Sequence, residues 1–280
     1  MRPFLMLREG RLLFPEYVPM TRTDLTDAEL ERYARHVILD EVGEDGQLKL
    51  LQSKVLVVGA GGLGSPVLLY LAAAGVGTLG IVDHDVVDTT NLQRQVIHST
   101  DDVGDAKVAS AAERIEALNP DITVHEHRQR LNAANAMGLI DGYDLVVDGS
   151  DNFAARYLLN DACYFAKKTL VSAALVRFEG QVSVYKTQDG GPCYRCLFPQ
   201  APDPDLVPRC DTVGILGSIA GVVGCIQATE VLKEILGIGT GLVGQLLLFD
   251  ALDMNTRKIK TKRDPNCALC GDNPTITALG

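Results

Sequence analysis

The sequence predicts an α/β protein with a Rossmann-like, doubly wound and mainly parallel sheet. First, an apolar strand at residues 54–59 runs into a glycine turn that opens an apolar helix. Second, short apolar strands alternate with helical segments as far as residue 175. Such alternation places helices on both faces of a parallel sheet. Third, the strand candidates beyond residue 175 have no helix directly after them, which predicts an antiparallel extension of the sheet.

The expected elements can be placed one by one from apolar patterns, caps and breakers. A capping box, Thr26 with Glu29, begins a helix that should run to about Val37. The expected strands are residues 54–59, 79–85, 122–127, 143–148, 169–175, 180–186 and 244–250, with 258–263 a further candidate. The expected helices are residues 63–74, 105–118, 132–140, 152–166 and 219–236. Residues 1–23 are expected to be an N-terminal extension, and residues 24–280 a single domain.

Composition narrows the classes of protein that fit. The chain of 280 residues has 46% hydrophobic and 22% charged residues, which is ordinary for a globular protein. Its net charge of −10 argues against a nucleic-acid partner, which would require a basic surface. No apolar run is long enough for a membrane span, and no signal peptide is evident. We therefore expect a cytoplasmic protein with reduced cysteines.

The turn after the first strand of the predicted sheet, Gly59-Ala-Gly61-Gly62-Leu-Gly64, fits the pattern G-x-G-x-x-G. Glycines permit the tight turn and the close approach of a phosphate, and the following helix offers free N–H groups. Asp83 ends the next strand and is placed to accept hydrogen bonds from a ribose. The pattern indicates an adenine nucleotide but does not separate NAD from ATP.

A set of polar residues after the later strands favours a triphosphate over a dinucleotide. It comprises Thr90-Asn91-Leu92-Gln93-Arg94, Lys107 and Asp151-Asn152. These segments follow strands, and the carboxyl ends of parallel strands meet at one edge of the sheet, where such folds bind ligands. The five histidines offer no obvious proton-transfer group for a dehydrogenase. An NAD-dependent oxidoreductase and a non-catalytic nucleotide-binding adaptor remain as alternatives.

Two C-x-x-C pairs, Cys193/Cys196 and Cys267/Cys270, can supply four thiolates to one tetrahedral ion, and Zn²⁺ is the usual occupant of such a site. The alternatives are a redox dithiol or unrelated buried cysteines. A shared metal site would tie the C-terminal segment back to the region around residue 193. Cys210 lies apart from both pairs, in a proline-rich loop.

Several motifs, in order and in register, resemble those of the HesA/MoeB/ThiF family, the bacterial relatives of ubiquitin-activating enzymes. The similarity covers roughly residues 24–271. The motifs are RYARHVIL from residue 32, VGAGGLGS from 58, DHDVVDTTNLQRQ from 83, GDAKV from 104, DGSDN from 148, and the pairs CYRC and CALC.

The resemblance implies an enzyme that binds ATP and Mg²⁺ and joins AMP to the C-terminal Gly-Gly carboxylate of a small ubiquitin-like sulfur carrier. It implies that Asp83 holds the ribose, that Asn91, Arg94 and Lys107 contact the phosphates, and that Asp151 holds Mg²⁺. It implies structural zinc on the four paired cysteines. It also implies a homodimer in which Arg35 reaches the neighbouring active site. Cys210 resembles a cysteine that in some members bonds covalently to the carrier, while a plain loop cysteine is the alternative reading.

We expect the carrier to be the small subunit of molybdopterin synthase, with the sulfur carrier of thiamine-thiazole synthesis as the alternative and a cysteine-synthesis carrier also open. No rhodanese domain is expected after Cys270, so the sulfur should come from a separate donor protein.

Overall fold

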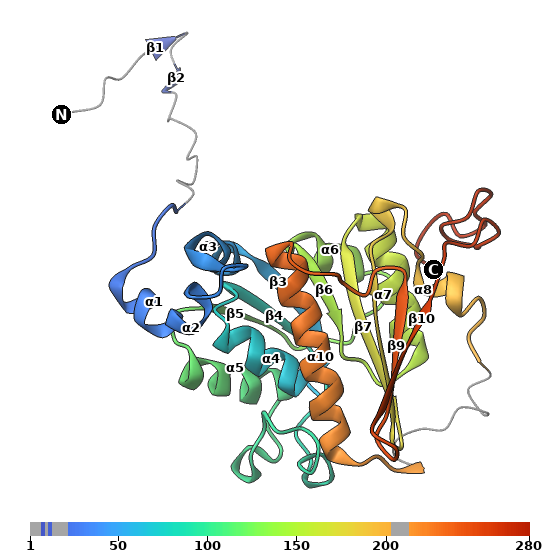
Figure 1. The fold of residues 1–280 in the computed structure, drawn as a ribbon, viewed down its shortest axis with the longest axis horizontal. Coiled ribbons are helices and arrows are strands. Elements are labelled where there is room, and N and C mark those ends of the chain that lie inside the picture. Colours follow the sequence, from blue (N-terminus) through green and yellow to red (C-terminus); the bar gives the residue numbers. More distant parts are fainter. Residues whose placement is uncertain (1–6, 9–10, 13–21, 203–212) are drawn as a thin grey trace.

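A computed structural model describes residues 7–8, 11–12, 22–202 and 213–280. Its main sheet has eight strands in the order β10-β9-β8-β7-β6-β3-β4-β5 (Figure 1). The strands are β3 (Lys54–Val58), β4 (Thr78–Val82), β5 (Thr123–His127), β6 (Leu145–Asp148), β7 (Thr169–Val176), β8 (Glu179–Tyr185), β9 (Gln245–Asp250) and β10 (Asn255–Lys260). A separate antiparallel pair, β1 (Leu7–Arg8) and β2 (Arg11–Leu12), lies in the N-terminal segment. The other residues of the predicted extension before residue 22 lie outside the described part.

The strand directions confirm the predicted mixed sheet. Strands β5, β4, β3, β6 and β7 are mutually parallel. Strands β8, β9 and β10 continue the sheet in antiparallel fashion. Chain order reverses between β3 and β6, because β4 lies on one side of β3 and β6 on the other. This is the topological switch point at which open α/β sheets bind ligands.

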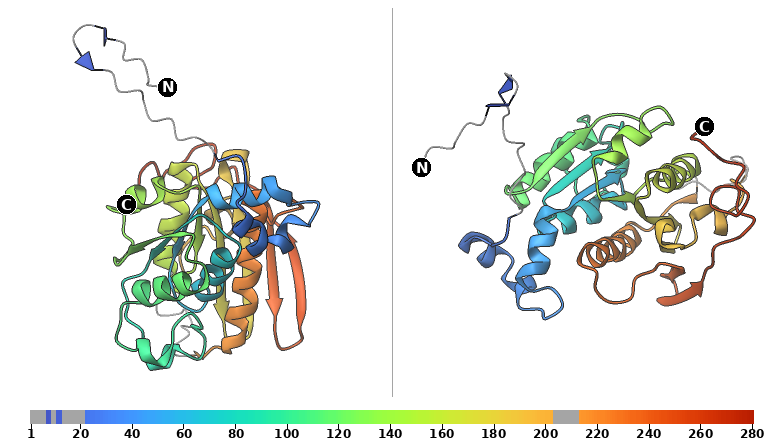
Figure 2. Two further views of the ribbon diagram at one scale, coloured as in Figure 1. Left: turned by 90° about the vertical axis from the view of Figure 1, so that its left-hand side faces the viewer. Right: turned by 90° about the horizontal axis from the view of Figure 1, so that it is seen from above.

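Helices cover both faces of the sheet (Figure 2). They are α1 (Asp27–Arg32), α2 (Ala34–Val37), α3 (Gly43–Gln52), α4 (Gly64–Ala73), α5 (Lys107–Leu118), α6 (Ala136–Asp141), α7 (Phe153–Ala166), α8 (Tyr194–Leu197) and α10 (Gly217–Leu236). Helices α4, α5 and α10 pack on one face with the side chains of Val55 and Val57. Helices α6, α7 and α8 pack on the other face with Leu56 and Val58. The alternation along β3 therefore feeds two apolar cores.

The first predicted helix is wrong in one respect, because it is broken at Tyr33 into α1 and α2. The Tyr33 ring is buried and packs so closely on Gly75 that a Cβ added there would lie 2.5 Å from it. Its hydroxyl also accepts a hydrogen bond from Asn119 Nδ2 at 2.9 Å. These tertiary contacts of the Tyr33 ring override the tendency of the segment to form one continuous helix. The local sequence does not encode such contacts.

Five further elements differ from the prediction. Strand β4 ends at Val82, although it was predicted to run to residue 85. Helix α3 was not predicted; two glycines at positions 43 and 46 weaken its signal. The short helix α8 was also not predicted. Helix α6 begins only at Ala136, because Asn132 and Asn135 form side-chain turns with the backbone before it. Strand β10 begins at residue 255, earlier than the predicted 258–263. In the described part of the chain, no helix combines the length and apolar character needed to cross a membrane.

Candidate active site and metal centre

The glycine turn between β3 and α4 is built so that only glycine fits at two positions. A Cβ at Gly64 would lie 1.9 Å from the carbonyl oxygen of Gly59. Gly59 itself has φ +96°, and a Cβ there would lie 2.7 Å from the carbonyl oxygen of Gly149. The second contact packs the turn against the loop after β6. The two loops therefore pack tightly together at the switch point. The N-terminus of α4 lies at this packed turn, and the N–H groups of a helix N-terminus can bind an anion.

Asp83, directly after β4, is held by backbone donors. Its Oδ2 accepts a hydrogen bond from Ala60 N in the glycine turn at 2.9 Å, and its Oδ1 accepts one from Asp85 N at 2.9 Å. A carboxylate has further lone pairs, so Asp83 can still accept from a ligand hydroxyl. In the described structure no acceptor lies within bonding distance of the N–H groups of Gly61 and Gly62. These donors remain open to an anion.

Lys107 is the buried cation of this edge. It is the first residue of α5, is 6% exposed, and donates from Nζ to Asp85 Oδ2 at 3.2 Å. Asp85 is exposed, so the ion pair is open to solvent on its acidic side. An ammonium group has three donors. Lys107 therefore keeps donor capacity for a phosphate while Asp85 balances its charge.

The segment Thr90–Arg94 forms a tight turn next to the glycine loop. Asp88 caps it, accepting from both the N–H and the hydroxyl of Thr90, and these bonds lower the pKa of Asp88. Arg94 Nη1 donates to Thr90 O at 3.1 Å, and the Arg94 side chain lies beside Gly62. The Gln93 backbone and side chain approach Gly217 at the start of α10. The Thr90 hydroxyl is thus engaged by Asp88.

Asn91 and Leu92 occupy the middle of this turn and are half-buried. The Asn91 carbonyl accepts from the N–H groups of Arg94 and Gln95, at 3.1 Å and 3.0 Å. Its side-chain amide has no partner among the described residues.

The two aspartates of the DGSDN motif have different environments. Asp148 is fully buried, and its oxygens accept bonds from Ser150, Ser172 Oγ and Arg156 Nε. Asp151 is exposed and is contacted by the neighbouring Asn152 amide at 3.3 Å. Asn152 also caps α7, because its Oδ1 accepts from Ala155 N at 2.9 Å. Asp148 therefore holds the loop together, while Asp151 is free to contact a ligand or metal.

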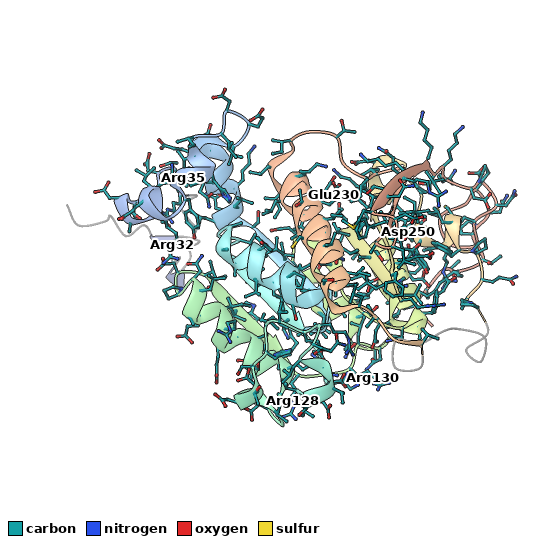
Figure 3. All side chains as sticks on the ribbon, turned by 60° about the horizontal axis from the view of Figure 1, so that its bottom comes forward. Arg32, Arg35, Arg128, Arg130, Glu230 and Asp250 are labelled. Carbon is teal, nitrogen blue, oxygen red and sulfur yellow. The ribbon has the colours of Figure 1, made fainter. Side chains whose placement is uncertain are left out.

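Arg35 does not join these residues within one chain. It is exposed on α2, and Figure 3 shows it well separated from Arg130. Arg130 marks the carboxyl edge of the sheet, because it follows β5 and donates to His84 Nε2 at 2.9 Å. Cys210, for which the sequence left a catalytic role and a plain loop cysteine open, lies outside the described residues.

Sequence reasoning missed three residues at this edge. Asp85 pairs with Lys107, His98 bonds to the glycine turn, and Gln95 lies against Gly61. Gln95 is buried, and its Oε1 has no hydrogen-bond partner among the described residues. Their roles arise from contacts across the fold, and the one signal in the sequence is their nearness to the TNLQR segment.

The four paired cysteines form one cluster, as predicted. Their sulfur atoms lie within 4.8 Å of one another. The separations are 3.8 Å for Cys193–Cys196, 3.5 Å for Cys193–Cys267 and 3.3 Å for Cys196–Cys270. A tetrahedral ion with Zn–S bonds of about 2.3 Å holds its sulfurs about 3.8 Å apart. The cluster therefore fits a single zinc ion with small adjustments.

The surroundings of the cluster suit a structural metal. Tyr164, Phe165 and Ile276 pack around it, so the sulfurs lie in an apolar shell. Asp264 N also donates a hydrogen bond to Cys196 Sγ at 3.4 Å, and such a donor stabilises the negative charge of a thiolate. The thiolate is the form of cysteine that binds metal.

Fold and site together define a class: a doubly wound α/β protein with a nucleotide-type glycine turn at its switch point and a four-cysteine cluster. The chain belongs to the ThiF family, whose model matches residues 33–269. It is 52% identical over 248 residues to a SAMP-activating enzyme E1 of Haloferax volcanii, covering 89% of this chain and 91% of the relative. It is 51% identical over 258 residues to a sulfur carrier protein adenylyltransferase of Thermus thermophilus, covering 91% and 95%.

Two other comparisons differ in extent. The chain is 50% identical to an adenylyltransferase and sulfurtransferase MOCS3 of Aedes aegypti, over 91% of this chain but only 58% of the relative. The solved structure of E. coli MccB with ATP superposes with a TM-score of 0.75 at 24% identity, covering 85% of this chain and 74% of the other. This last likeness supports the fold alone.

Proposed function

We propose that this protein adenylates the C-terminal glycine carboxylate of a small ubiquitin-like sulfur carrier, using ATP and releasing pyrophosphate. The observation that carries the proposal is the similarity of about half of all residues, over nearly the whole length, to a relative named as a sulfur carrier protein adenylyltransferase. The glycine turn, Arg94 and Lys107 support it, because they bring N–H donors and two cations to the carboxyl edge of the sheet.

The reaction joins two anions. A carboxylate oxygen of the carrier attacks the α-phosphorus of ATP, a C–O–P bond forms, and the bond to the β-phosphate oxygen breaks with its electron pair leaving on pyrophosphate. A carboxylate is already ionised at pH 7, so no general base is required. The protein must instead position the reactants and stabilise the growing negative charge. This requirement agrees with an edge that offers cations and N–H donors.

The residue roles follow from this chemistry. Asp83 accepts from the ribose hydroxyls, and the open N–H groups of Gly61 and Gly62 receive a phosphate oxygen. Lys107 and Arg94 neutralise phosphate charge. Asp151 would hold Mg²⁺, whose charge would reduce the repulsion between the phosphates and the incoming carboxylate.

Two features of the assembly complete the proposal. Arg35 serves the active site of a neighbouring copy, so the working unit is a homodimer; the resemblance of the motif around Arg35 to that of the family supports this role, and its exposure on α2 leaves it accessible to another chain. The four-cysteine cluster holds a structural zinc ion that fixes the C-terminal segment to α8. We further propose that the domain spans residues 24–280 and that a separate protein donates the sulfur.

We propose the small subunit of molybdopterin synthase as the carrier. The experiment is ATP–pyrophosphate exchange with purified candidate carriers that end in Gly-Gly, including those of the molybdopterin and thiamine pathways. Exchange with the molybdopterin carrier alone supports the full proposal, and exchange with another carrier alone corrects the pathway. Absence of exchange with every carrier, together with tight NAD binding, would overturn the assignment in favour of an oxidoreductase.

A further inference from the structure

The buried side chain of His98 forms a hydrogen bond with the backbone of the glycine turn. His98 is 6% exposed, and its Nε2 lies 2.9 Å from the carbonyl oxygen of Ala60. A carbonyl oxygen can only accept, so the proton of the imidazole must be on Nε2. Ala60 is thereby fixed on both sides, because its N–H donates to Asp83 Oδ2 at 2.9 Å.

The direction of the Ala60 carbonyl determines the direction of the next N–H. The peptide bond between Ala60 and Gly61 is planar and trans, so the carbonyl and the Gly61 N–H point in opposite directions. With the carbonyl fixed on the buried imidazole, the Gly61 N–H must point away from it. This N–H is one of the two open donors of the turn.

The imidazole is itself held by a chain of hydrogen bonds. Its Nδ1 lies 2.7 Å from Ser110 Oγ on α5, and Ser110 Oγ lies 2.9 Å from Asp102 Oδ2. Asp102 is held in turn by Ser99 N at 2.6 Å. Ser110 lies one helical turn after Lys107, so the chain connects the glycine turn to the start of the helix that carries the buried ammonium.

We propose that His98 is a positioning residue for ATP: its Nε2–H fixes the Ala60–Gly61 peptide so that the Gly61 N–H faces the phosphates. The role rests on the proposed function and assigns to His98 no contact with ATP itself. Burial lowers the pKa of His98 and the charge of Lys107 lowers it further, while the bond to Ala60 O and the charges of Asp102 and Asp83 act in the raising direction. The ring is therefore neutral at pH 7 with its one proton on Nε2, and the single hydroxyl proton of Ser110 is shared between two acceptors, His98 Nδ1 and Asp102 Oδ2.

The test compares His98→Leu, which removes the donor, with His98→Gln, whose amide N–H can reach the same carbonyl. ATP affinity is measured directly by calorimetry on the folded full-length protein, and thermal unfolding is recorded for each variant. We expect His98→Leu to weaken ATP binding about tenfold, the scale of one hydrogen bond. His98→Gln should recover most of it. His127→Leu is the matched control, since His127 is also partly buried and bonds the Tyr143 hydroxyl at 2.8 Å, and it should leave ATP affinity unchanged.

Two outcomes would sink the inference: folded His98→Leu with ATP affinity within about twofold of the parent protein, or Gln as weak as Leu. If His98→Leu does not fold, Ser110→Ala takes its place, because it frees Nδ1 and should weaken ATP binding about threefold; unchanged affinity would overturn the role. Failure of the proposed function looks different, because the parent protein would then show no pyrophosphate exchange with any carrier, whatever the effect of His98→Leu on ATP binding.

Discussion

Replacing Lys107 with methionine separates catalysis from stability. Methionine keeps the length and apolar stem of lysine but removes the charge. The Lys107 side chain is 7% exposed, so little solvent screens its charge from a bound phosphate. Lys107 Nζ lies 3.2 Å from Asp85 Oδ2, and the Asp85 side chain is 53% exposed. Because water screens Asp85, this ion pair offsets little of the attraction between Lys107 and a bound phosphate.

The magnitude follows from these surroundings. Removal of one preorganised donor to developing charge costs about 3–4 kcal/mol, or roughly 100- to 1000-fold in rate. Loss of an ion pair that is open to water changes the free energy of unfolding by only about 1 kcal/mol or less. We therefore expect Lys107→Met to lose most adenylation activity while it melts near the temperature of the parent protein.

The assay is single-turnover formation of the acyl-adenylate, with thermal unfolding measured on the same samples. Lys186→Met is the matched control. Lys186 also pairs with carboxylates, those of Asp189 and Glu234. It follows the antiparallel strand β8 and therefore lies at the end of the sheet where the parallel strands begin, away from their carboxyl ends. A loss of less than about fivefold in Lys107→Met, or an equal loss in Lys186→Met, would refute the reasoning.

Three more outcomes are expected. Asp85→Asn leaves the Lys107 ammonium without its anion, so the ATP-free protein should melt earlier and gain more stability from ATP than the parent does, which thermal unfolding with and without ATP can check. The purified protein should contain about one zinc per chain by elemental analysis, and Cys267→Ser should lose that zinc and expose the segment after residue 263 to protease. Burial holds the pKa of His98 in the folded protein below its ordinary 6.5. As the pH falls below 6.5, the unfolded chain therefore binds a proton at His98 that the folded chain does not bind. The free energy of unfolding should therefore fall on acidification from pH 6.5, less steeply in His98→Gln, and equal slopes in urea titrations would contradict this.

Periodic patterns carried the prediction of the fold because each strand of the parallel core is buried on both faces. Strand β3 is a continuous apolar run for this reason, and its alternate residues enter the two cores. The prediction failed where a distant contact decided local structure. Tyr33 breaks the first helix because its ring is anchored on Gly75 and Asn119, and neither partner is near it in the sequence.

The candidate site also has features that the sequence predicted and features that depended on distant contacts. The glycine turn and the cysteine pairs were predictable because their chemistry depends on spacing along the chain. The unequal exposure of Asp148 and Asp151 was not, because Arg156 and Ser172, which satisfy Asp148, come from other elements. His98 was overlooked for the same reason, since its partner Ala60 lies 38 residues away.

The charge balance at the carboxyl edge supports Asp151 as the ligand of the proposed Mg²⁺. Five aspartates end or follow β4 and β6, and four of them already have strong donors: Asp83 has two backbone N–H groups, Asp85 has Lys107, Asp88 has Thr90, and Asp148 has Arg156 with two serines. A fully ionised aspartate next to a triphosphate would repel it unless a cation lies between them. Asp151, whose one contact is a long bond from the adjacent Asn152 amide, is the aspartate that lacks such compensation. A divalent ion held by Asp151 would reduce that repulsion, so the carboxylate that the fold leaves uncompensated is the one that we propose to hold Mg²⁺.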